Sequence, residues 1–503
     1  MDHSASPSPR SLSWTSLVVL TLLAALVEAV ILFPSTLFPT TRFAAALSWD
    51  ASRHDYPSPE TPAGETPATP EAVTPATPAP QSPAAAPAPR RGDARAITGR
   101  VLDAATGAPL RGASIWAGPT EIVTNAEGRF TTAPIEPGAT VWVKTPGYER
   151  KKLTGGEGAA EVTVKLAPHP VRAAYLTYYG VADRTIRQRV LDLVERTELN
   201  AVVIDIKGDR GLIPYRTSVQ AAIDAGALGP VIIKDFDEQL AAWKARGIYT
   251  IARIVAFKDN VRAMTRPDLA VIDTRTGKPW IDRENLAWVD PFREENWDYI
   301  IAVAKEAALK GFDEIQFDYV RFPTDGKLAA ARYSQPNSAA TRLPAVAAFL
   351  AKARRELGPT GAFLAADIFG YTAFNANDTD IGQRIEEISM SLDYICPMVY
   401  PSGYHLGIPG VRNPMLNPYE IVKESVRLTR QRSQNPAAQV RPWLQDFKDY
   451  AFDKRIFGPG EVRAQIRGSD DGGGSGWMLW NPKNDYTAAA LRPKTSAISK
   501  SSQ

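Results

Sequence analysis

The chain has very little cysteine and histidine, the residues that most often hold metals or cross-link a fold. Cys396 is its one cysteine, so no disulfide can form within the chain, and its place in an apolar run favours a buried hydrophobic role. None of the histidines shows the close spacing typical of zinc ligands: His3, His54, His169 and His405. We therefore expect no metal site and no cofactor.

The chain also has no marked excess of basic or of acidic residues. Lys and Arg number 58 against 55 for Asp and Glu, a net charge of +3, and no long basic run lies outside helical patterns. Nucleic-acid-binding proteins usually present a strongly basic surface, so we do not expect nucleic acid as a partner. The length of 503 residues and a hydrophobic content of 44% are ample for more than one globular domain.

The apolar stretch LSWTSLVVLTLLAALVEAVILF, residues 12–33, contains hydroxyl residues and Glu28 and follows Arg10. It predicts a membrane segment within residues 1–36, a signal peptide or a signal anchor, with the anchor favoured. The membrane is therefore an expected partner. We expect an exported protein of the cell envelope, anchored in the inner membrane, with its C-terminal domains in the periplasm or outside.

Residues 37–96 are expected to form a disordered linker. The part from 51 to 96 is crowded with Pro, Ala, Thr and Ser, as in TPAGETPATPEAVTPATPAPQSPAAAPAP, and almost lacks large apolar side chains. Such a segment cannot bury enough surface to offset the entropy lost on ordering. A short polar tail, residues 493–503, is expected at the other end of the chain.

Residues 97–168 change to short alternating runs separated by turns that contain Gly, Pro and Asn, which predicts a small antiparallel β-sandwich. They resemble the carboxypeptidase regulatory-like domain in the pattern G-x-V-x-D-x-x-T-G-x-P-L-x-G-A and in a later T-N-A-E-G-R-F turn. The first pattern is carried by Gly99, Val101, Asp103, Thr106, Gly107, Pro109, Leu110, Gly112 and Ala113. The resemblance implies a non-catalytic accessory domain.

Residues 169–492 alternate strand-like runs with amphipathic helical patterns. The eight runs are 172–180, 200–208, 248–257, 312–322, 362–371, 394–401, 440–447 and 476–482. Eight strands with intervening helices predict an α/β fold, a (β/α)8 TIM barrel. A doubly wound open sheet is the competing fold, but no glycine-rich phosphate-binding motif follows any of these runs.

The segment GFDEIQFDYVRFP, residues 311–323, places acids in what otherwise looks like a core strand. Because side chains alternate, Glu314, Gln316 and Asp318 share the face that would point into the barrel. Asp318 lies near the carboxyl end of the strand, where barrel enzymes keep their chemistry. Asp313 and Glu314, near its start, are expected to form stabilising ion pairs instead.

Polar and aromatic residues end the other predicted strands as well. They include Asp205, Lys207, Arg253, Asp367, Tyr400, Gln445, Asp446, Trp480 and Asn481, with Tyr178, Tyr179, Tyr319, Phe369, Tyr371, Tyr404, Trp443 and Trp477 close by. Carboxylates beside flat aromatic platforms suit a carbohydrate, which has hydroxyls at its edge and C–H groups on its faces. A polysaccharide or oligosaccharide is therefore the expected partner.

Breaking a glycosidic bond requires one carboxyl group to protonate the leaving oxygen and a second, ionised one to attack or to activate water. Asp318 and Asp367, on adjacent predicted strands, are the expected catalytic pair, with retaining and inverting spacings both open. Arg321 is expected to keep Asp318 ionised through a charge-assisted hydrogen bond. The expected substrate-binding or supporting residues are Asp205, Arg321, Tyr400, Asp446 and Trp480.

Residues 172–482 resemble a bacterial family of glycoside hydrolases, the domain of unknown function numbered 4015. The resemblance rests on AYLTYYG, NAVVIDIKGDRG, WVDPFREENWDY, GFDEIQFDYVRFP and GWMLWNP. It implies a barrel similar to the α-amylase and α-galactosidase groups, with the acid of the fourth strand as nucleophile, a position that Asp318 matches. The fifth-strand acid is usually Glu there, whereas this chain has Asp367, and the seventh-strand acid would be Asp446.

The sequence thus predicts a glycoside hydrolase for a cell-envelope or exported polysaccharide. A non-catalytic carbohydrate-binding barrel is the alternative; it would keep the aromatic residues but leave Asp318 and Asp367 apart or in salt bridges. A polysaccharide deacetylase is disfavoured because its His and Asp metal pattern is absent.

Overall fold

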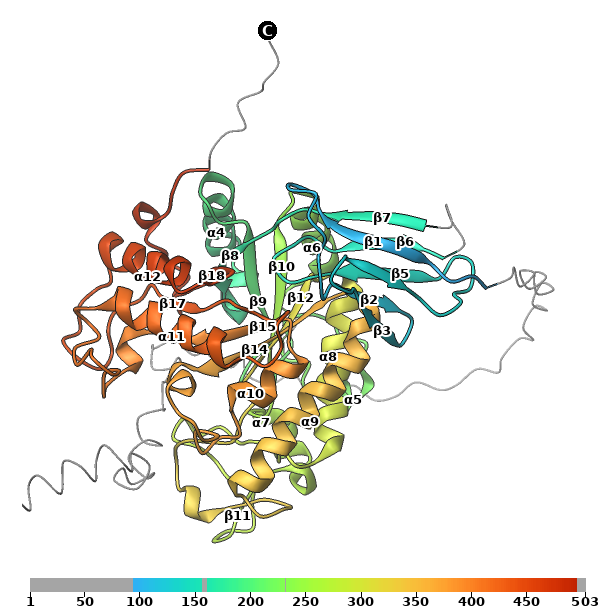
Figure 1. The fold of residues 1–503 in the computed structure, drawn as a ribbon. Coiled ribbons are helices and arrows are strands. Elements are labelled where there is room, and N and C mark those ends of the chain that lie inside the picture. Colours follow the sequence, from blue (N-terminus) through green and yellow to red (C-terminus); the bar gives the residue numbers. More distant parts are fainter. Residues whose placement is uncertain (1–93, 156–160, 231, 495–503) are drawn as a thin grey trace, which may run out of the picture. The chain divides into compact units, whose positions relative to one another are not determined.

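The computed structural model describes residues 94–155, 161–230 and 232–494 (Figure 1). The predicted membrane segment 12–33, nearly all of the predicted linker and most of the polar tail lie outside the described residues. Within the described ranges, no helix combines the length and the apolar character needed to cross a bilayer.

Residues 98–166 fold into two small β-sheets. One sheet consists of β1 (Thr98–Asp103), β4 (Arg129–Thr131) and β7 (Glu161–Leu166), and the other of β2 (Ser114–Ala117), β3 (Thr120–Val123), β5 (Thr140–Lys144) and β6 (Lys151–Thr154). Val101 and Val164 of the first sheet share one buried cluster with Ile115 and Val143 of the second, which makes the pair a β-sandwich. The expected antiparallel pairing is wrong at one place, because β1 and β7 run parallel.

The rest of the described chain is built on a closed barrel with eight parallel strand positions, here called staves. Its strands are β8 (Val171–Leu176), β9 (Ala201–Lys207), β10 (Tyr249–Val255), β12 (Glu314–Asp318), β14 (Phe363–Phe369), β15 (Tyr394–Met398), β16 (Gln439–Val440), β17 (Trp443–Gln445) and β18 (Gly476–Trp480). These nine strands fill eight staves, because β16 and β17 share the seventh stave. They follow the order β14-β12-β10-β9-β8-β18-β17-β15, and the pairing of β14 with β15 closes the ring. The (β/α)8 prediction is thereby confirmed.

All eight strands lie within the predicted runs or one residue from them, but several end early: β12 ends at Asp318 rather than residue 322, and β15 ends at Met398 rather than residue 401. The first stave ends at Leu176 rather than residue 180, because the Thr177 side chain accepts a hydrogen bond from the Gly180 amide and caps a short helix. The seventh stave is split into β16 and β17 at Pro442, which has no N–H to give to a strand ladder.

Helices surround the barrel between the staves (Figure 1). The α-helices are α3 (Tyr178–Ala182), α4 (Arg184–Arg196), α5 (Gln220–Asp224), α6 (Phe236–Ala245), α7 (Asn260–Thr265), α8 (Glu294–Lys310), α9 (Ala339–Leu357), α10 (Ile385–Ile388), α11 (Pro418–Arg432) and α12 (Pro459–Asp471). The 3-10 helices are η1 (Pro267–Leu269), η2 (Leu328–Ala330), η3 (Gly358–Thr360), η4 (Gly370–Ala373), η5 (Ser389–Ser391), η6 (Pro401–Gly403) and η7 (Ala488–Ala490). A small separate sheet pairs β11 (Ile272–Asp273) with β13 (Ala331–Arg332).

The turn before β12 sets the position of that strand. Gly311 ends α8 with a φ of 112°, a left-handed conformation that a residue with a Cβ avoids. Three residues later β12 begins, and it pairs with β10 on one side and β14 on the other. The helix end and the two neighbours together fix which β12 side chains face inward.

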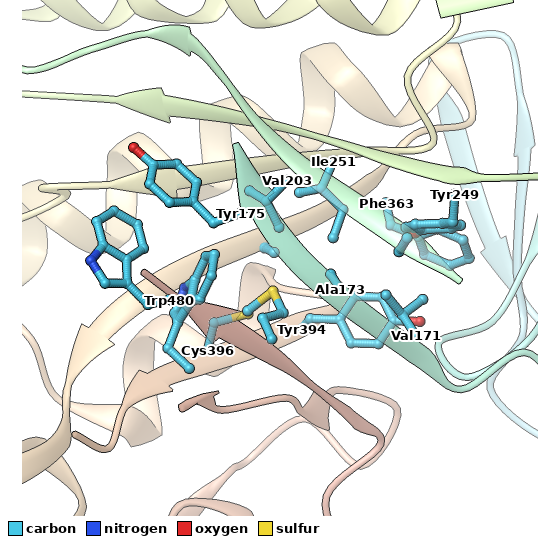
Figure 2. Close-up of a cluster of buried hydrophobic side chains, with 14 of the residues drawn as sticks. Val171, Ala173, Tyr175, Val203, Tyr249, Ile251, Phe363, Tyr394, Cys396 and Trp480 are labelled. Atoms are coloured by element: carbon cyan, nitrogen blue, oxygen red, sulfur yellow. The ribbon is translucent and has the colours of Figure 1, made fainter. Parts of the chain in front are cut away.

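Alternate side chains of the staves fill the barrel interior. Figure 2 shows this cluster, with Tyr249 and Phe363 at one end and Tyr175 and Trp480 at the other. Cys396 lies within it and is fully buried, as predicted. The interior is therefore a packed core below its carboxyl rim.

The acids at the start of β12 form structural ion pairs, as predicted. Glu314 is completely buried and pairs with Arg441 while accepting a hydrogen bond of 3.0 Å from the Tyr249 hydroxyl. Asp313 pairs with Lys244 and, at 3.2 Å, with Arg150 of the segment that follows β5. Both acids lie at the amino end of the strand, away from its carboxyl rim.

The β-sandwich also contacts that amino end of the barrel. Lys144, the last residue of β5, donates to the carbonyl of Ala362 at 2.6 Å and to Oδ2 of Asp393 at 2.7 Å. Ala362 and Asp393 directly precede β14 and β15. These contacts of the sandwich thus lie at the end opposite the carboxyl ends of the staves.

Candidate active site

Asp318 is the last residue of β12, at the carboxyl rim of the barrel. The next residue, Tyr319, has a φ of 50°, which ends the strand and turns the chain. The Asp318 side chain is only 6% exposed. Its Oδ1 accepts a hydrogen bond of 2.6 Å from the Tyr319 amide, and its Oδ2 accepts two from Arg253, from Nε at 3.1 Å and from Nη2.

Arg253, on the neighbouring strand β10, joins two carboxylates. Its Nη1 donates to Oδ1 of Asp205, on β9, at 2.6 Å. Burial lowers the pKa of Arg253, but the charges of Asp205 and Asp318 outweigh it and raise this pKa well above the ordinary value. Arg253 is therefore a permanent cation between two acids.

Asp205 is held by more than this one ion pair. The Tyr175 hydroxyl of β8 donates to its Oδ2 at 2.5 Å, and the Tyr178 amide donates to the same atom at 3.3 Å. Burial raises the pKa of Asp205, and Arg253 opposes that rise. Asp205 thus lies at the rim, where it orients Arg253.

Asp367 lies on β14, beside Asp318. Phe317 of β12 pairs with Ala366 of β14, so the next residue on each strand is one of the two aspartates, and both side chains face inward. Asp367 is 1% exposed, and its Oδ1 accepts a hydrogen bond of 2.7 Å from Nε1 of Trp443. Its Oδ2 has no hydrogen-bond partner among the described residues.

The two aspartates have different electrostatic surroundings. Burial, and then the negative charge of Asp318, raise the pKa of Asp367 well above its ordinary value, although Arg253 and Trp443 oppose the rise. Asp318 has a direct cationic partner in Arg253, whereas Asp367 has none in the described chain. The rim thus places a carboxylate paired with a cation beside a carboxyl group whose pKa is raised, an arrangement that can support acid and base chemistry.

Aromatic side chains surround the acids. The Tyr175 and Trp480 rings stack with centroids 3.9 Å apart and an interplanar angle of 9°, and Trp443 meets Trp480 edge-on at 5.3 Å. The Arg253 guanidinium lies 5.1 Å from the Trp480 ring. Tyr400 packs in the same buried cluster as Trp443 and Trp480, and burial, followed by the charges of Asp367 and Asp318, raises its pKa well above the ordinary value.

Arg321 does not make the expected hydrogen bond to Asp318. In the described chain, Arg253 takes that place, and Arg321 donates instead to the carbonyl of Phe322 at 3.0 Å. Its strand ends at Asp318, so alternation no longer directs Arg321 to either face. The guanidinium lies over the rings of Tyr319 and Phe369, at 4.8 and 4.7 Å, and so remains close to the rim.

Asp446 lies apart from the other acids. It follows β17 with the opposite alternation to Trp443, and its carboxylate accepts hydrogen bonds from the amide and hydroxyl of Thr487 at 2.9 and 2.6 Å. Burial raises its pKa to about 6. The structure therefore brings together Asp318, Asp367, Asp205, Tyr400 and Trp480, with Arg321 at their edge, but not Asp446.

Arg253 and Trp443 were named among the residues near the strand ends but were given no role in the site, and Tyr175 was not named. One signal for Arg253 is present: it follows Tyr249 and Ile251 at alternate positions of β10, so it continues a face that points into the barrel. A charge on an otherwise apolar inward face indicates a partner across the barrel. Alternation gives neither Tyr175 nor Trp443 a role in the site, because aromatic residues are frequent in cores.

The barrel is a glycoside hydrolase-like domain. Residues 173–486 match the model of a family, the domain of unknown function 4015, which is described as "Putative glycosyl hydrolase domain". The match spans more than half of the chain. The protein belongs to this family.

Solved structures resemble parts of the chain. A hypothetical protein from Ruminiclostridium thermocellum is 39% identical over 39% of this chain and 96% of its own, with a TM-score of 0.35. The glycoside hydrolase domain of PgaB from Bordetella bronchiseptica is 15% identical over 63% and 95%, with a TM-score of 0.46. A group II chitinase catalytic domain from Ostrinia furnacalis is 11% identical over 64% and 95%, with a TM-score of 0.40. No curated protein matches the chain.

Proposed function

We propose that the protein is a glycoside hydrolase that acts on a cell-envelope or exported polysaccharide through Asp318 and Asp367. The observation that carries the proposal is the neighbouring pair itself. Asp318 is bound to a cation, and the raised pKa of Asp367 favours a proton on it. A glycosidase needs one ionised and one protonated carboxyl group, one on each side of the scissile bond.

In the proposed mechanism Asp367 protonates the leaving glycosidic oxygen. Its Oδ1 is occupied by Trp443, so the unpartnered Oδ2 is the atom that would carry the proton. Burial, and then the nearby charge of Asp318, oppose the loss of that proton and raise the pKa of Asp367, which suits it to the role of general acid.

Asp318 would supply the negative charge. Arg253 binds Oδ2 and the Tyr319 amide binds Oδ1, so the carboxylate is fixed in orientation and Oδ1 keeps a further lone pair. This atom would attack the anomeric carbon or activate a water molecule. Asp205 and Tyr175 hold Arg253 in place, and Tyr400 and Trp480 would contact the sugar.

The proposal places this activity at the cell envelope. The apolar segment 12–33 would anchor the chain in the inner membrane, and the Pro/Ala-rich linker, residues 37–96, would space the barrel away from it. The β-sandwich would serve as a carboxypeptidase regulatory-like accessory domain. Its contacts at the amino end of the barrel leave the opposite rim to the substrate.

The decisive test is Asp318→Asn in the full-length protein. We expect the release of reducing ends from α- and β-linked glycans and envelope polysaccharides to fall at least about a hundredfold, while binding to the same polysaccharide remains. Asp192→Asn, on helix α4 outside the barrel, is the matched control and should keep full activity, because among the described residues the Asp192 carboxylate accepts only an exposed hydrogen bond, from Gln188. Unchanged hydrolysis in Asp318→Asn would exclude the proposed role.

A non-catalytic carbohydrate-binding barrel remains the second candidate. It is favoured by one observation, the ion pair between Asp318 and Arg253, which is what a purely structural aspartate would form. Under this alternative the wild-type protein binds a polysaccharide but releases no reducing ends from it.

A further inference from the structure

Arg321 is a buried cation without an anionic partner. Its residue exposure is 8%, and in the described chain its guanidinium has one hydrogen-bond acceptor, the Phe322 carbonyl, and no ion pair. Burying an uncompensated charge is costly, so such a group is normally paired or used. The remaining N–H donors of Arg321 are available to a ligand.

Three aromatic rings fix the guanidinium in place. Its centre lies 5.1 Å from the Trp288 ring, 4.8 Å from Tyr319 and 4.7 Å from Phe369. Phe369 follows Asp367 by two residues on β14, so the two side chains share the inward face of that stave. Arg321 is therefore positioned at the rim beside the Asp318 and Asp367 pair.

The carboxylates around Arg321 are already bound elsewhere. Asp318 accepts from Arg253 and from the Tyr319 amide. Asp282 pairs with Lys258 at 3.0 Å and accepts from Nε1 of Trp288, also at 3.0 Å. These carboxylates therefore do not complete the coordination of Arg321.

A third carboxylate, that of Asp325, accepts from the Arg283 amide at 3.1 Å and forms no ion pair with Arg321. The acids near this guanidinium weaken the net positive charge of the region. None of these described acids accepts a hydrogen bond from Arg321, however. The paired N–H donors of its guanidinium, its fork, can therefore bind a planar anion that is part of the substrate.

We infer that Arg321 binds a carboxylate carried by the sugar, so that the preferred substrate contains uronic acid residues. This inference rests on the proposed function, since it assigns the substrate class of the same rim. A guanidinium and a carboxylate are both planar and can share two parallel hydrogen bonds, which a neutral hydroxymethyl group cannot do. The carboxylate would also supply the counter-charge that the described residues do not provide.

The test compares the binding of matched acidic and neutral sugars to the full-length protein. The probes are D-glucuronate, D-galacturonate and D-mannuronate, each against its parent hexose, measured by titration NMR. We expect the wild-type protein to bind at least one uronate about tenfold more tightly than its hexose, because hydrogen bonds to charged groups are among the strong ones. Absence of a preference in all three pairs would overturn the inference.

Two variants assign the preference to Arg321. Arg321→Gln keeps a polar side chain but removes the charge and the fork, and it should abolish the preference. Arg266→Gln, at an exposed arginine that pairs with Asp268, is the matched control and should retain it. A uronate preference that survives in Arg321→Gln would contradict the assignment.

The test of uronate binding by Arg321 is independent of the test of hydrolysis. Binding of uronates needs no hydrolysis, so a preference that depends on Arg321 would stand even if the wild-type protein released no reducing ends or Asp318→Asn left hydrolysis unchanged. Circular dichroism checks that Arg321→Gln is folded. If it is not, Arg321→Lys, which keeps the charge and loses the fork, should lower the preference at least about threefold, and an unchanged preference there would count against the inference.

Discussion

Arg253 binds Asp318 through two of its nitrogens, Nε and Nη2, which both donate to Oδ2. The contact joins neighbouring strands, since Val255 of β10 pairs with Asp318 of β12. Arg253, on the third strand of the barrel, thus holds the Asp318 carboxylate, on the fourth strand, in position. Because the same guanidinium also binds Asp205, three staves are tied together at the place where we propose that catalysis occurs.

Removal of Arg253 should therefore affect both stability and activity. In Arg253→Gln, Asp205 and Asp318 lose their counter-ion while still buried, and we expect the free energy of unfolding to fall by about 3 to 5 kcal/mol. Denaturant unfolding of the full-length protein measures this change. Adding Asp205→Asn to the variant should restore part of the loss.

The control for this prediction is an exposed ion pair. Arg129 and Glu161 pair at 2.8 Å in the β-sandwich with more than half of each side chain exposed. Arg129→Gln should leave the unfolding free energy nearly unchanged. A similar effect of the two arginine substitutions would contradict the view that Arg253 is a buried counter-ion.

Asp367→Asn should abolish the proposed general acid. Asn has the shape of the carboxyl group and can still accept the Trp443 hydrogen bond, but it has no proton to transfer. We expect kcat for an unactivated glycan to fall by about a hundredfold to ten-thousandfold. For an aryl glycoside whose leaving group needs no protonation, the loss should be much smaller, and equal losses on the two substrates would argue against the acid role.

Trp443→Phe should shift the pH profile. The Trp443 hydrogen bond lowers the pKa of Asp367, so its removal raises that pKa further. Activity requires the protonated acid and is lost as pH rises through this pKa, so the alkaline limb of kcat/KM should move upward by about one pH unit. A limb that stays in place, or moves to lower pH, would show that a different group sets it.

The buried carboxyl group of Asp446 should make the free energy of unfolding depend on pH. Burial raises its pKa from 3.8 to about 6, so the folded protein holds a proton that the unfolded chain releases between these values. Stability is therefore lost as pH rises through this window, by about 3 kcal/mol. Asp446→Asn should remove this loss, so the unfolding free energy of wild type relative to Asp446→Asn should fall between pH 4 and pH 7.

Asp192→Asn serves as the control for that measurement, because Asp192 lies on α4 and its carboxylate accepts, within the described chain, only an exposed hydrogen bond from Gln188. Its difference from wild type should stay constant over the same pH range. If Asp446→Asn showed the same pH dependence as wild type, the buried carboxyl would not be the group that titrates.

The sequence predicted the staves well because each leaves a local pattern. The β12 segment shows polar and apolar residues at alternate positions, so the inward direction of Glu314 and Asp318 follows from strand geometry alone. The closeness of Asp318 and Asp367 followed from their matching places on adjacent strands. These inferences need only the period of the strand and the order of the staves.

Partner choice was harder to predict. Arg321 is close to Asp318 in sequence and was expected to be its partner, yet Arg253, 65 residues away, takes that position. The strand ends between Asp318 and Arg321, and the left-handed turn at Tyr319 redirects the chain. Asp446 was misplaced for a similar reason, because it follows the end of its stave and bonds to Thr487 instead.

By itself, then, the sequence determined the eight-staved architecture, the carboxyl rim and the two aspartates on it, because hydrophobic periodicity is local and each stave carries its own. Only the tertiary structure decided which cation pairs with Asp318, which oxygen of Asp367 is left open, and which buried arginine has no anionic partner among the described residues. Such pairings depend on side chains that meet across the barrel from distant segments, and the electrostatic cost of burying a charge is set by that meeting.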